Sequence, residues 1–148
     1  MNPQALLISI RPRFAEMIFN GTKTVELRRV CPRVRKGDLA LVYVSSPLME
    51  VQGAFEVASV ITDSPAKLWI RVGKKTGITR TEFMNYFSGK KQGHALCIKR
   101  AWKLGAVIAL SSLRQQARGF QPPQSYRYVC SATMPKALGA RLELAGRN

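Results

Sequence analysis

The chain has 148 residues and a mass of 16.5 kDa, which is enough for one domain with one hydrophobic core. Hydrophobic residues make up 46% and charged residues 22% of it, a composition that excludes a disordered chain, a disulfide scaffold and a collagen or coiled-coil repeat. Twenty-four Lys and Arg against eight Asp and Glu give a net charge of +16 and a pI near 10.7, so the composition predicts a polyanionic partner, most simply nucleic acid.

Hydrophobic periodicity and capping residues predict the element order β-α-β-β-β-α-α-β-α-β. The predicted strands are 6–10, 22–30, 38–44, 51–61, 93–104 and one after the break at 121–124, and the predicted helices are 12–20 and short ones from 65, from 79 or 81 and from 111 or 112. Gly53 predicts a bulge or bend within its strand, where simple alternation puts Val51 and Phe55 on one side. We expect an α+β fold, a curved mixed sheet or β-pseudo-barrel with flanking short helices, in residues 1–130, and a loosely packed tail in 131–148.

Several residue patterns argue against particular sites and locations. Cys31, Cys97 and Cys130 are widely spaced with no C-x-x-C pair, which indicates reduced thiols in a cytosolic protein. The single histidine, His94, excludes Ser-His-Asp, Cys-His and multi-histidine metal sites, and we expect neither a metal nor a cofactor. The first residues carry no secretory signal, and the longest apolar run, 104–110, is too short for a membrane span. We therefore expect a cytoplasmic protein without a membrane partner.

The excess positive charge is unevenly distributed along the chain. Residues 11–36, 67–103 and 104–148 carry +6, +9 and +5, whereas residues 37–66 carry −4 and contain no Lys or Arg. This segregation favours one basic face, with the acidic segment lying away from it. A merely solubilising basic surface is the alternative.

A charged cluster follows the first predicted helix in the pattern Gly21-x-Lys23-x-x-Glu26-x-Arg28, after a strand and helix opened by Ser9-Ile-Arg-Pro. This pattern, the strand Gly53-Ala-Phe-Glu-Val and the end segment Leu113-Arg…Gly119-Phe-Gln-Pro-Pro-Gln-Ser-Tyr126-Arg127 resemble the ASCH domains of the PUA-like superfamily, over about residues 5–128. The resemblance implies a PUA-like β-barrel with flanking helices, a cleft beside the motif, and RNA binding. It also implies that the chain could be an enzyme, because the family includes N4-acetylcytidine amidohydrolases and a ribonuclease.

The resemblance to the amidohydrolase branch implies catalytic roles for Lys23 and Glu82 if the protein is an enzyme, and Glu26 is the third catalytic candidate. Glu26 departs from that branch, which has a threonine there, so attack through a hydroxyl is unavailable. A Glu26–Glu82 pair could instead activate water while Lys23 stabilises an oxyanion. On a regular strand Lys23 and Glu26 face opposite ways, so their convergence requires a bend just after Gly21. The alternative for this cluster is an ion-pair ladder that closes the barrel.

Eleven residues are candidates for nucleic-acid binding, because guanidinium and ammonium groups hold phosphates and a tyrosine stacks on bases. They are Arg11, Arg13, Lys23, Arg28, Arg29, Lys74, Lys75, Lys90, Lys91, Tyr126 and Arg127. The alternatives are solvated arginines at the helix start, lysines that only solubilise loops, and core packing for Tyr126.

Three functions compete. The first is a binding module for nucleic acid, RNA in the first place with DNA left open, with a basic face and a cleft for one base or nucleoside. The second is a small metal-independent hydrolase, an amidohydrolase or ribonuclease. The third is an interaction protein whose basic surface docks an acidic partner such as a transcription complex. The charge favours the first, because a free nucleoside substrate does not need a net charge of +16.

Overall fold

The computed structural model describes residues 5–129, and its elements follow in the predicted order. They are β1 (Ala5–Ile10), α1 (Pro12–Phe19), β2 (Val25–Arg28), β3 (Leu39–Val44), β4 (Glu50–Asp63), α2 (Pro65–Val72), the 3-10 helix η1 (Gly73–Lys75), α3 (Arg80–Tyr86), β5 (Gly93–Ala109), α4 (Leu110–Gln116) and β6 (Tyr126–Val129). The expected tail at 131–148 and Cys130 lie outside the described residues. Within residues 5–129, no helix is long and apolar enough to cross a membrane.

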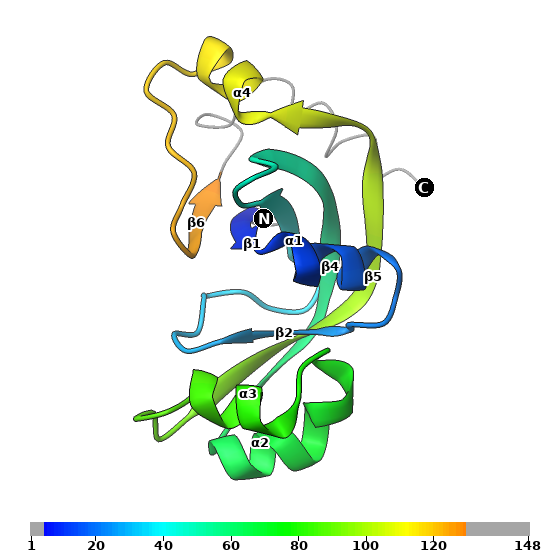
Figure 1. The fold of residues 1–148 in the computed structure, drawn as a ribbon, viewed down its shortest axis with the longest axis vertical. Coiled ribbons are helices and arrows are strands. Elements are labelled where there is room, and N and C mark those ends of the chain that lie inside the picture. The colour runs from blue at the N-terminus through cyan, green and yellow to red at the C-terminus, as the bar shows by residue number, and fades with distance from the viewer. Residues whose placement is uncertain (1–4, 130–148) are drawn as a thin grey trace.

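The strands form one mixed sheet in the order β2-β5-β4-β3-β1-β6. β1 pairs with β3 in parallel, and every other pair is antiparallel. The long strands β4 and β5 shift register three times along their ladder, and such bulges increase the local twist of a sheet. The sheet consequently curls into a half-barrel, which confirms the predicted fold (Figure 1).

Gly53 is the residue at which β4 bends. The register with β5 shifts between Val51 and Gly53, as predicted, and a Cβ on Gly53 would collide with the Trp102 carbonyl oxygen. The shift also breaks the simple alternation of the strand. Val51 packs into the core cluster that includes α4, whereas Phe55 packs into the cluster that includes α1, so the prediction that they share one side is wrong.

The helices cover different parts of the half-barrel. Helix α1 contributes Ala15 and Ile18 to the core on one face of the sheet, and α4 closes the opposite end of the molecule (Figure 1). Helices α2 and α3 pack through Leu68 and Phe83 against Leu27 of β2, and they form a separate lobe at the lower end of Figure 1. Strand β2 therefore lies between α1 and this helical lobe, and it carries the charged motif.

Candidate functional site

A cavity of about 440 Å³, called the recess below, opens where α1, β2, α3 and the segment before β6 meet. It brings together three sequence-predicted groups: the motif residues, the first arginine of the opening segment and Glu82. Its lining residues are Ser9, Ile10, Arg11, Phe14, Lys23, Glu26, Leu27, Arg28, Ser45, Ile78, Glu82, Tyr86 and Gln124. A volume of this size lies within the range of about 300–1,000 Å³ that is typical of small-ligand sites.

The chain bends after α1 in the way that convergence of Lys23 and Glu26 requires. Gly21 has φ of +85°, a left-handed conformation that ends the helix, and the Lys23 amide donates back to the Met17 carbonyl at 3.0 Å. Regular pairing of β2 begins only at Val25, three residues later than predicted. Lys23 therefore lies before the strand, and the alternation rule does not separate it from Glu26.

Lys23, Glu26 and Arg28 form a buried ion triad on the floor of the recess. Glu26 Oε1 accepts from Arg28 Nη2 at 3.0 Å, and Glu26 Oε2 lies 3.6 Å from Lys23 Nζ. The three side chains are only 4–10% exposed. Two cations and one carboxylate leave a local excess of one positive charge. The cluster is an ion-pair network that also lines a cavity, so the two predictions for it do not exclude each other.

Two backbone carbonyls and one side-chain hydroxyl hold the two cations in place. Lys23 Nζ donates to the Thr76 carbonyl at 2.7 Å, which joins the motif to the helical lobe. Arg28 Nη2 also donates to the Ser9 carbonyl at 3.2 Å, and Nη1 donates to Ser125 Oγ at 3.1 Å. The motif is therefore fixed to three separate parts of the chain.

Two polar atoms of the triad lack hydrogen-bond partners. Within residues 5–129, the buried side-chain atoms without one are Glu26 Oε2, Arg28 Nε and Trp102 Nε1. The 3.6 Å from Glu26 Oε2 to Lys23 Nζ makes an ion pair but is too long for a hydrogen bond. An acceptor and a donor thus lie unsatisfied at one site, and such buried groups are uncommon in folded proteins.

Burial shifts the pKa values of two groups that line the recess. Desolvation lowers the pKa of Lys23 below its ordinary value, and the Glu26 carboxylate opposes part of that effect. Burial likewise raises the pKa of Tyr86, whose hydroxyl donates to the Leu27 carbonyl at 3.1 Å. The Phe14 ring lies 5.3 Å from Lys23 Nζ, so aromatic surface and positive charge adjoin in the recess.

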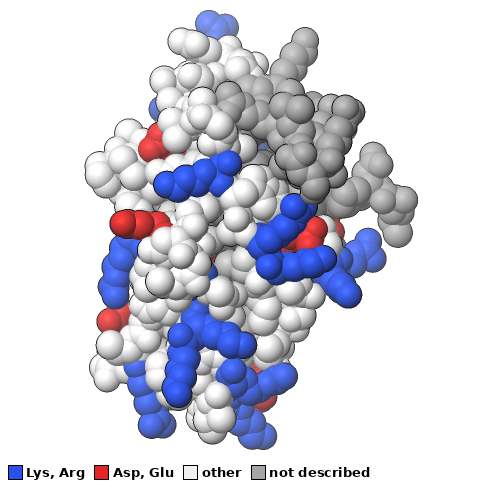
Figure 2. Space-filling model, turned by 90° about the vertical axis from the view of Figure 1, so that its right-hand side faces the viewer, with Lys and Arg blue, Asp and Glu red and all other residues white. Residues whose placement is uncertain are grey.

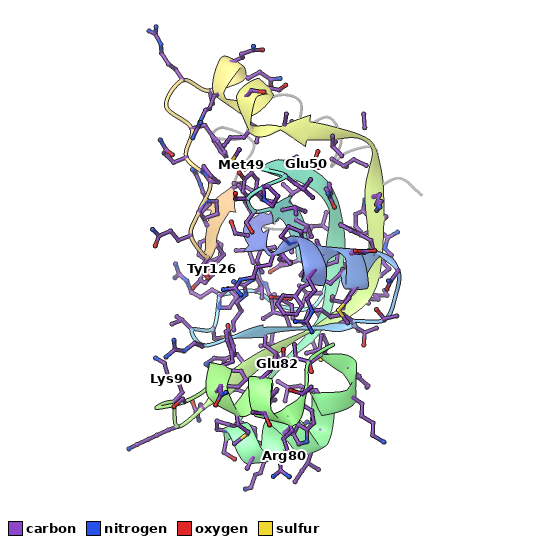
Figure 3. The ribbon with its side chains drawn as sticks, in the orientation of Figure 1. Met49, Glu50, Arg80, Glu82, Lys90 and Tyr126 are labelled. Atoms are coloured by element: carbon purple, nitrogen blue, oxygen red, sulfur yellow. The ribbon has the colours of Figure 1, made fainter. Side chains whose placement is uncertain are left out.

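Glu82 lies at the rim of the recess, between α3 and β2 in Figure 3. Helix α3 begins after Thr79, one of the two caps that the sequence offered, and the Thr79 hydroxyl oxygen accepts from the Glu82 amide at 3.2 Å. The Glu82 carboxylate is 43% exposed and lies 3.6 Å from Arg13 Nη1 across the mouth. The two glutamates thus differ: Glu26 is buried and paired with two cations, while Glu82 is solvated.

The other predicted residues do not line the recess. Tyr126 packs against Tyr128 and the core, and Arg127 lies over the Phe120 ring. Arg13 lies at the rim, and Arg29 is exposed directly after β2. The four predicted lysines are exposed in η1 and in the turn before β5, where Figure 3 labels one of them; they are Lys74, Lys75, Lys90 and Lys91.

Eight lining residues were not predicted as site residues: the apolar ones are Ile10, Phe14, Leu27 and Ile78, and the polar ones are Ser9, Ser45, Tyr86 and Gln124. Ser9 and Gln124 lie within the segments that carry the family resemblance, which was the available signal for them. Ser45 directly follows β3 and Tyr86 is the last residue of α3, and neither belonged to a predicted motif. They reach the recess only through the tertiary fold.

The acidic segment does not lie away from the basic residues, so that prediction is wrong. Glu56 of β4 is 3.3 Å from Lys99 and 3.9 Å from Arg100 of the neighbouring strand. Asp63 is likewise 3.7 Å from Arg71. Figure 2 accordingly shows acidic side chains beside several of the basic ones on that face. Pairing of β4 with β5 brings the opposite charges together, and it leaves other basic segments unneutralised.

Metal-ligating residues do not cluster in the part of the chain that the structure describes. Within residues 5–129, no group of three or more His, Cys, Asp or Glu side chains is placed to hold a metal ion. His94 lies outside the recess, with Nδ1 at 2.8 Å from Thr62 Oγ1, and burial lowers its pKa.

Comparison with known proteins adds the family context. The profile of the ASCH domain matches residues 8–115. The chain is 28% identical over 123 residues to a protein named ASCH domain-containing ribonuclease from Zymomonas mobilis, covering 83% of this chain and 82% of that protein. It is 33% identical over 121 residues to large ribosomal subunit protein uL22 of Ureaplasma parvum, but it spans only 39% of that protein. The crystal structure of ASCH from Zymomonas mobilis superposes with a TM-score of 0.84 at 27% identity, over 91% of this chain and 94% of that one.

Proposed function

This chain belongs to the ASCH domain family, and from that premise we propose that it binds RNA and holds one base or nucleoside in the recess beside Lys23, Glu26 and Arg28. The observation that carries the proposal is the pair of unsatisfied atoms there. Glu26 Oε2 accepts and Arg28 Nε donates, and neither has a hydrogen-bond partner among residues 5–129. A base edge carries both donors and acceptors, so it matches both atoms chemically and reaches them when the buried Glu26 and Arg28 side chains turn toward the recess.

The rest of the recess suits the same ligand. Phe14 and Tyr86 offer aromatic surface on which a base stacks. The triad carries a local charge of +1, and Arg11 is exposed at the edge, so a phosphate attached to the nucleoside is attracted rather than repelled. The named ribonuclease relative supports RNA as the nucleic acid, and DNA is the alternative that the binding assay tests.

The free thiols Cys31 and Cys97 support the predicted cytoplasmic location.

The test of this proposal is RNA binding by wild-type protein and by Arg28→Gln, measured by fluorescence anisotropy with a labelled 12-nucleotide single-stranded RNA and the same sequence as DNA. We expect tight binding at low salt, a steep loss of affinity with salt, and a loss of at least about tenfold in the variant. Lys67→Gln, which removes one exposed charge on α2, is the control. Absence of binding at low salt, or equal affinity of both variants, contradicts the proposal.

Hydrolysis of RNA or of an acylated nucleoside is the second candidate, favoured by the ribonuclease relative and by the lowered pKa of Lys23. Solvated Glu82 is the group best placed to take a proton, because its carboxylate lines the recess and is open to water. The Lys23–Arg28 cation pair would then stabilise negative charge that develops on an oxygen. The buried Glu26 would keep both cations in place.

An activity assay separates the two candidates. Purified protein is incubated with single-stranded RNA and with N4-acetylcytidine, with and without a chelator, and products are quantified for wild type, Glu82→Gln and Lys23→Met. Turnover that Glu82→Gln abolishes while RNA affinity persists supports a hydrolase. Turnover that neither variant changes shows that a different site performs it.

A further inference from the structure

The segment that follows β2 carries the densest positive charge in the chain. Residues 29–36, here called the basic loop, contain four exposed basic residues and no acidic one; they are Arg29, Arg33, Arg35 and Lys36. Within residues 5–129 none of these four side chains forms an ion pair, in contrast to the cations of β5 and α2 that face Glu56 and Asp63. Like charges gathered without counter-charges repel one another, so the arrangement favours an anionic ligand.

The basic loop is held through its backbone and through the Arg33 guanidinium, which lies 5.7 Å from the centre of the Tyr128 ring. The Arg33 amide donates to the Tyr128 hydroxyl, and the Arg35 amide donates to Oδ2 of the buried Asp38 at 3.0 Å. Pro32 is buried, and Val34 packs on the core. The loop backbone is therefore anchored from below while the side chains of Arg35 and Lys36 extend into solvent.

The basic loop adjoins the recess. Arg28 lines the recess and the next residue, Arg29, begins the loop, so their Cα atoms are about 3.8 Å apart. The chain around β6 contacts both features, because Ser125 holds Arg28 and Tyr128 holds the backbone of Arg33. Ser125 and Tyr128 are three residues apart, and three residues of extended chain span about 10 Å. In Figure 1 the loop leaves β2 on the side where β6 begins.

We propose that the basic loop is a phosphate-binding site for the RNA strand whose base enters the recess, an inference that rests on the proposed function. The strand passes from the recess over Arg29 and Arg33 toward Arg35 and Lys36, which contact phosphates further along the same strand. The ligand is then an RNA strand of several nucleotides, and the loop supplies affinity without reading sequence.

Arg35→Gln/Lys36→Gln tests this inference, because both side chains are exposed, neither forms a hydrogen bond or ion pair within residues 5–129, and the anchoring amides are retained. Lys67→Gln/Arg118→Gln removes two exposed charges elsewhere and is the matched control. Affinity for a labelled 12-nucleotide single-stranded RNA and for a dinucleotide is measured from 0.05 to 0.5 M salt, and urea unfolding checks that the variants are folded.

Each lost phosphate contact lowers the slope of log affinity against log salt by about 0.7 for a single strand. The loop variant should therefore lose about 1.4 in slope and about 25-fold in affinity for the 12-mer at 0.1 M salt. Its affinity for the dinucleotide, which is too short to span recess and loop, should stay within about twofold of wild type, as should the control with both ligands.

Three results overturn the inference. The loop variant binds the 12-mer like wild type, or the control loses as much affinity, or a 12-residue polyglutamate peptide binds as tightly as RNA with the same loss in the loop variant. The last result identifies an acidic protein as the partner of the loop. In the first two cases the proposed function still stands if wild-type protein binds RNA and Arg28→Gln weakens that binding. If wild-type protein binds no RNA, both the proposed function and this inference are wrong.

Discussion

Glu26→Gln should destabilise the fold far more than an ordinary surface substitution. At an effective dielectric constant of about 20, attractions across 3.0 Å to Arg28 and 3.6 Å to Lys23 amount to about 5.5 and 4.6 kcal/mol. The desolvation penalty of the carboxylate, several kcal/mol, is relieved at the same time. The net loss in the free energy of unfolding should be about 3–5 kcal/mol, because two buried cations lose their common counter-charge.

Urea unfolding followed by circular dichroism measures this loss, and Glu56→Gln is a matched control. Glu56 also lies between two cations, but Lys99 and Arg100 are 61% and 44% exposed, so we expect a loss of about 1 kcal/mol or less. In a double-mutant cycle, adding Lys23→Met should recover part of the loss in Glu26→Gln but none in Glu56→Gln. Equal destabilisation by the two glutamine variants would refute the reasoning that the triad is a buried, interdependent unit.

Three further predictions concern the same structure. The pKa of Lys23 in the folded protein lies below its ordinary value of 10.5, so above the folded pKa the unfolded chain binds more protons than the folded one. The free energy of unfolding of wild type, relative to that of Lys23→Met, should therefore rise as the pH approaches 10.5. A difference between the two proteins that shrinks from about pH 7 to about pH 10 contradicts this prediction. Gly53→Ala should cost about 3 kcal/mol because its methyl group meets the Trp102 carbonyl and the Phe19 ring, while Gly105→Ala, with nothing within 4 Å, should cost little; equal urea midpoints argue against a tight bend at Gly53. Phe14→Leu should weaken RNA binding by about 5–100-fold through lost stacking, measured by anisotropy, and unchanged affinity would remove Phe14 from the proposed base site.

Local signals were sufficient to predict the order of the elements. Pro12 and Gly21 mark the two ends of α1, and Thr79 caps α3, because these residues act through their own backbone or an adjacent amide. The curved sheet was predictable for a similar reason, since Gly53 marks the bulge at which β4 changes register.

The partners of the charged residues depended on tertiary contacts that the sequence does not carry. The motif predicted that Lys23 and Glu26 belong together, but Thr76 and Ser125, which hold Lys23 and Arg28, lie 53 and 97 residues away. The pairing of Glu56 with Lys99 arises from the β4–β5 register, which joins residues from segments of opposite charge. Segment charges therefore predicted an anionic partner but not which cations stay unpaired.

Backbone amide chemical shifts, recorded while the 12-nucleotide RNA is titrated into labelled protein, test the central claim most directly. If a base enters the recess, the largest shifts should fall on residues 9–11, 23–28 and 82–86, which surround it. Shifts confined to the outward side of β5, for example at Lys99 and Lys103, with those three segments unchanged at saturation, would contradict the account.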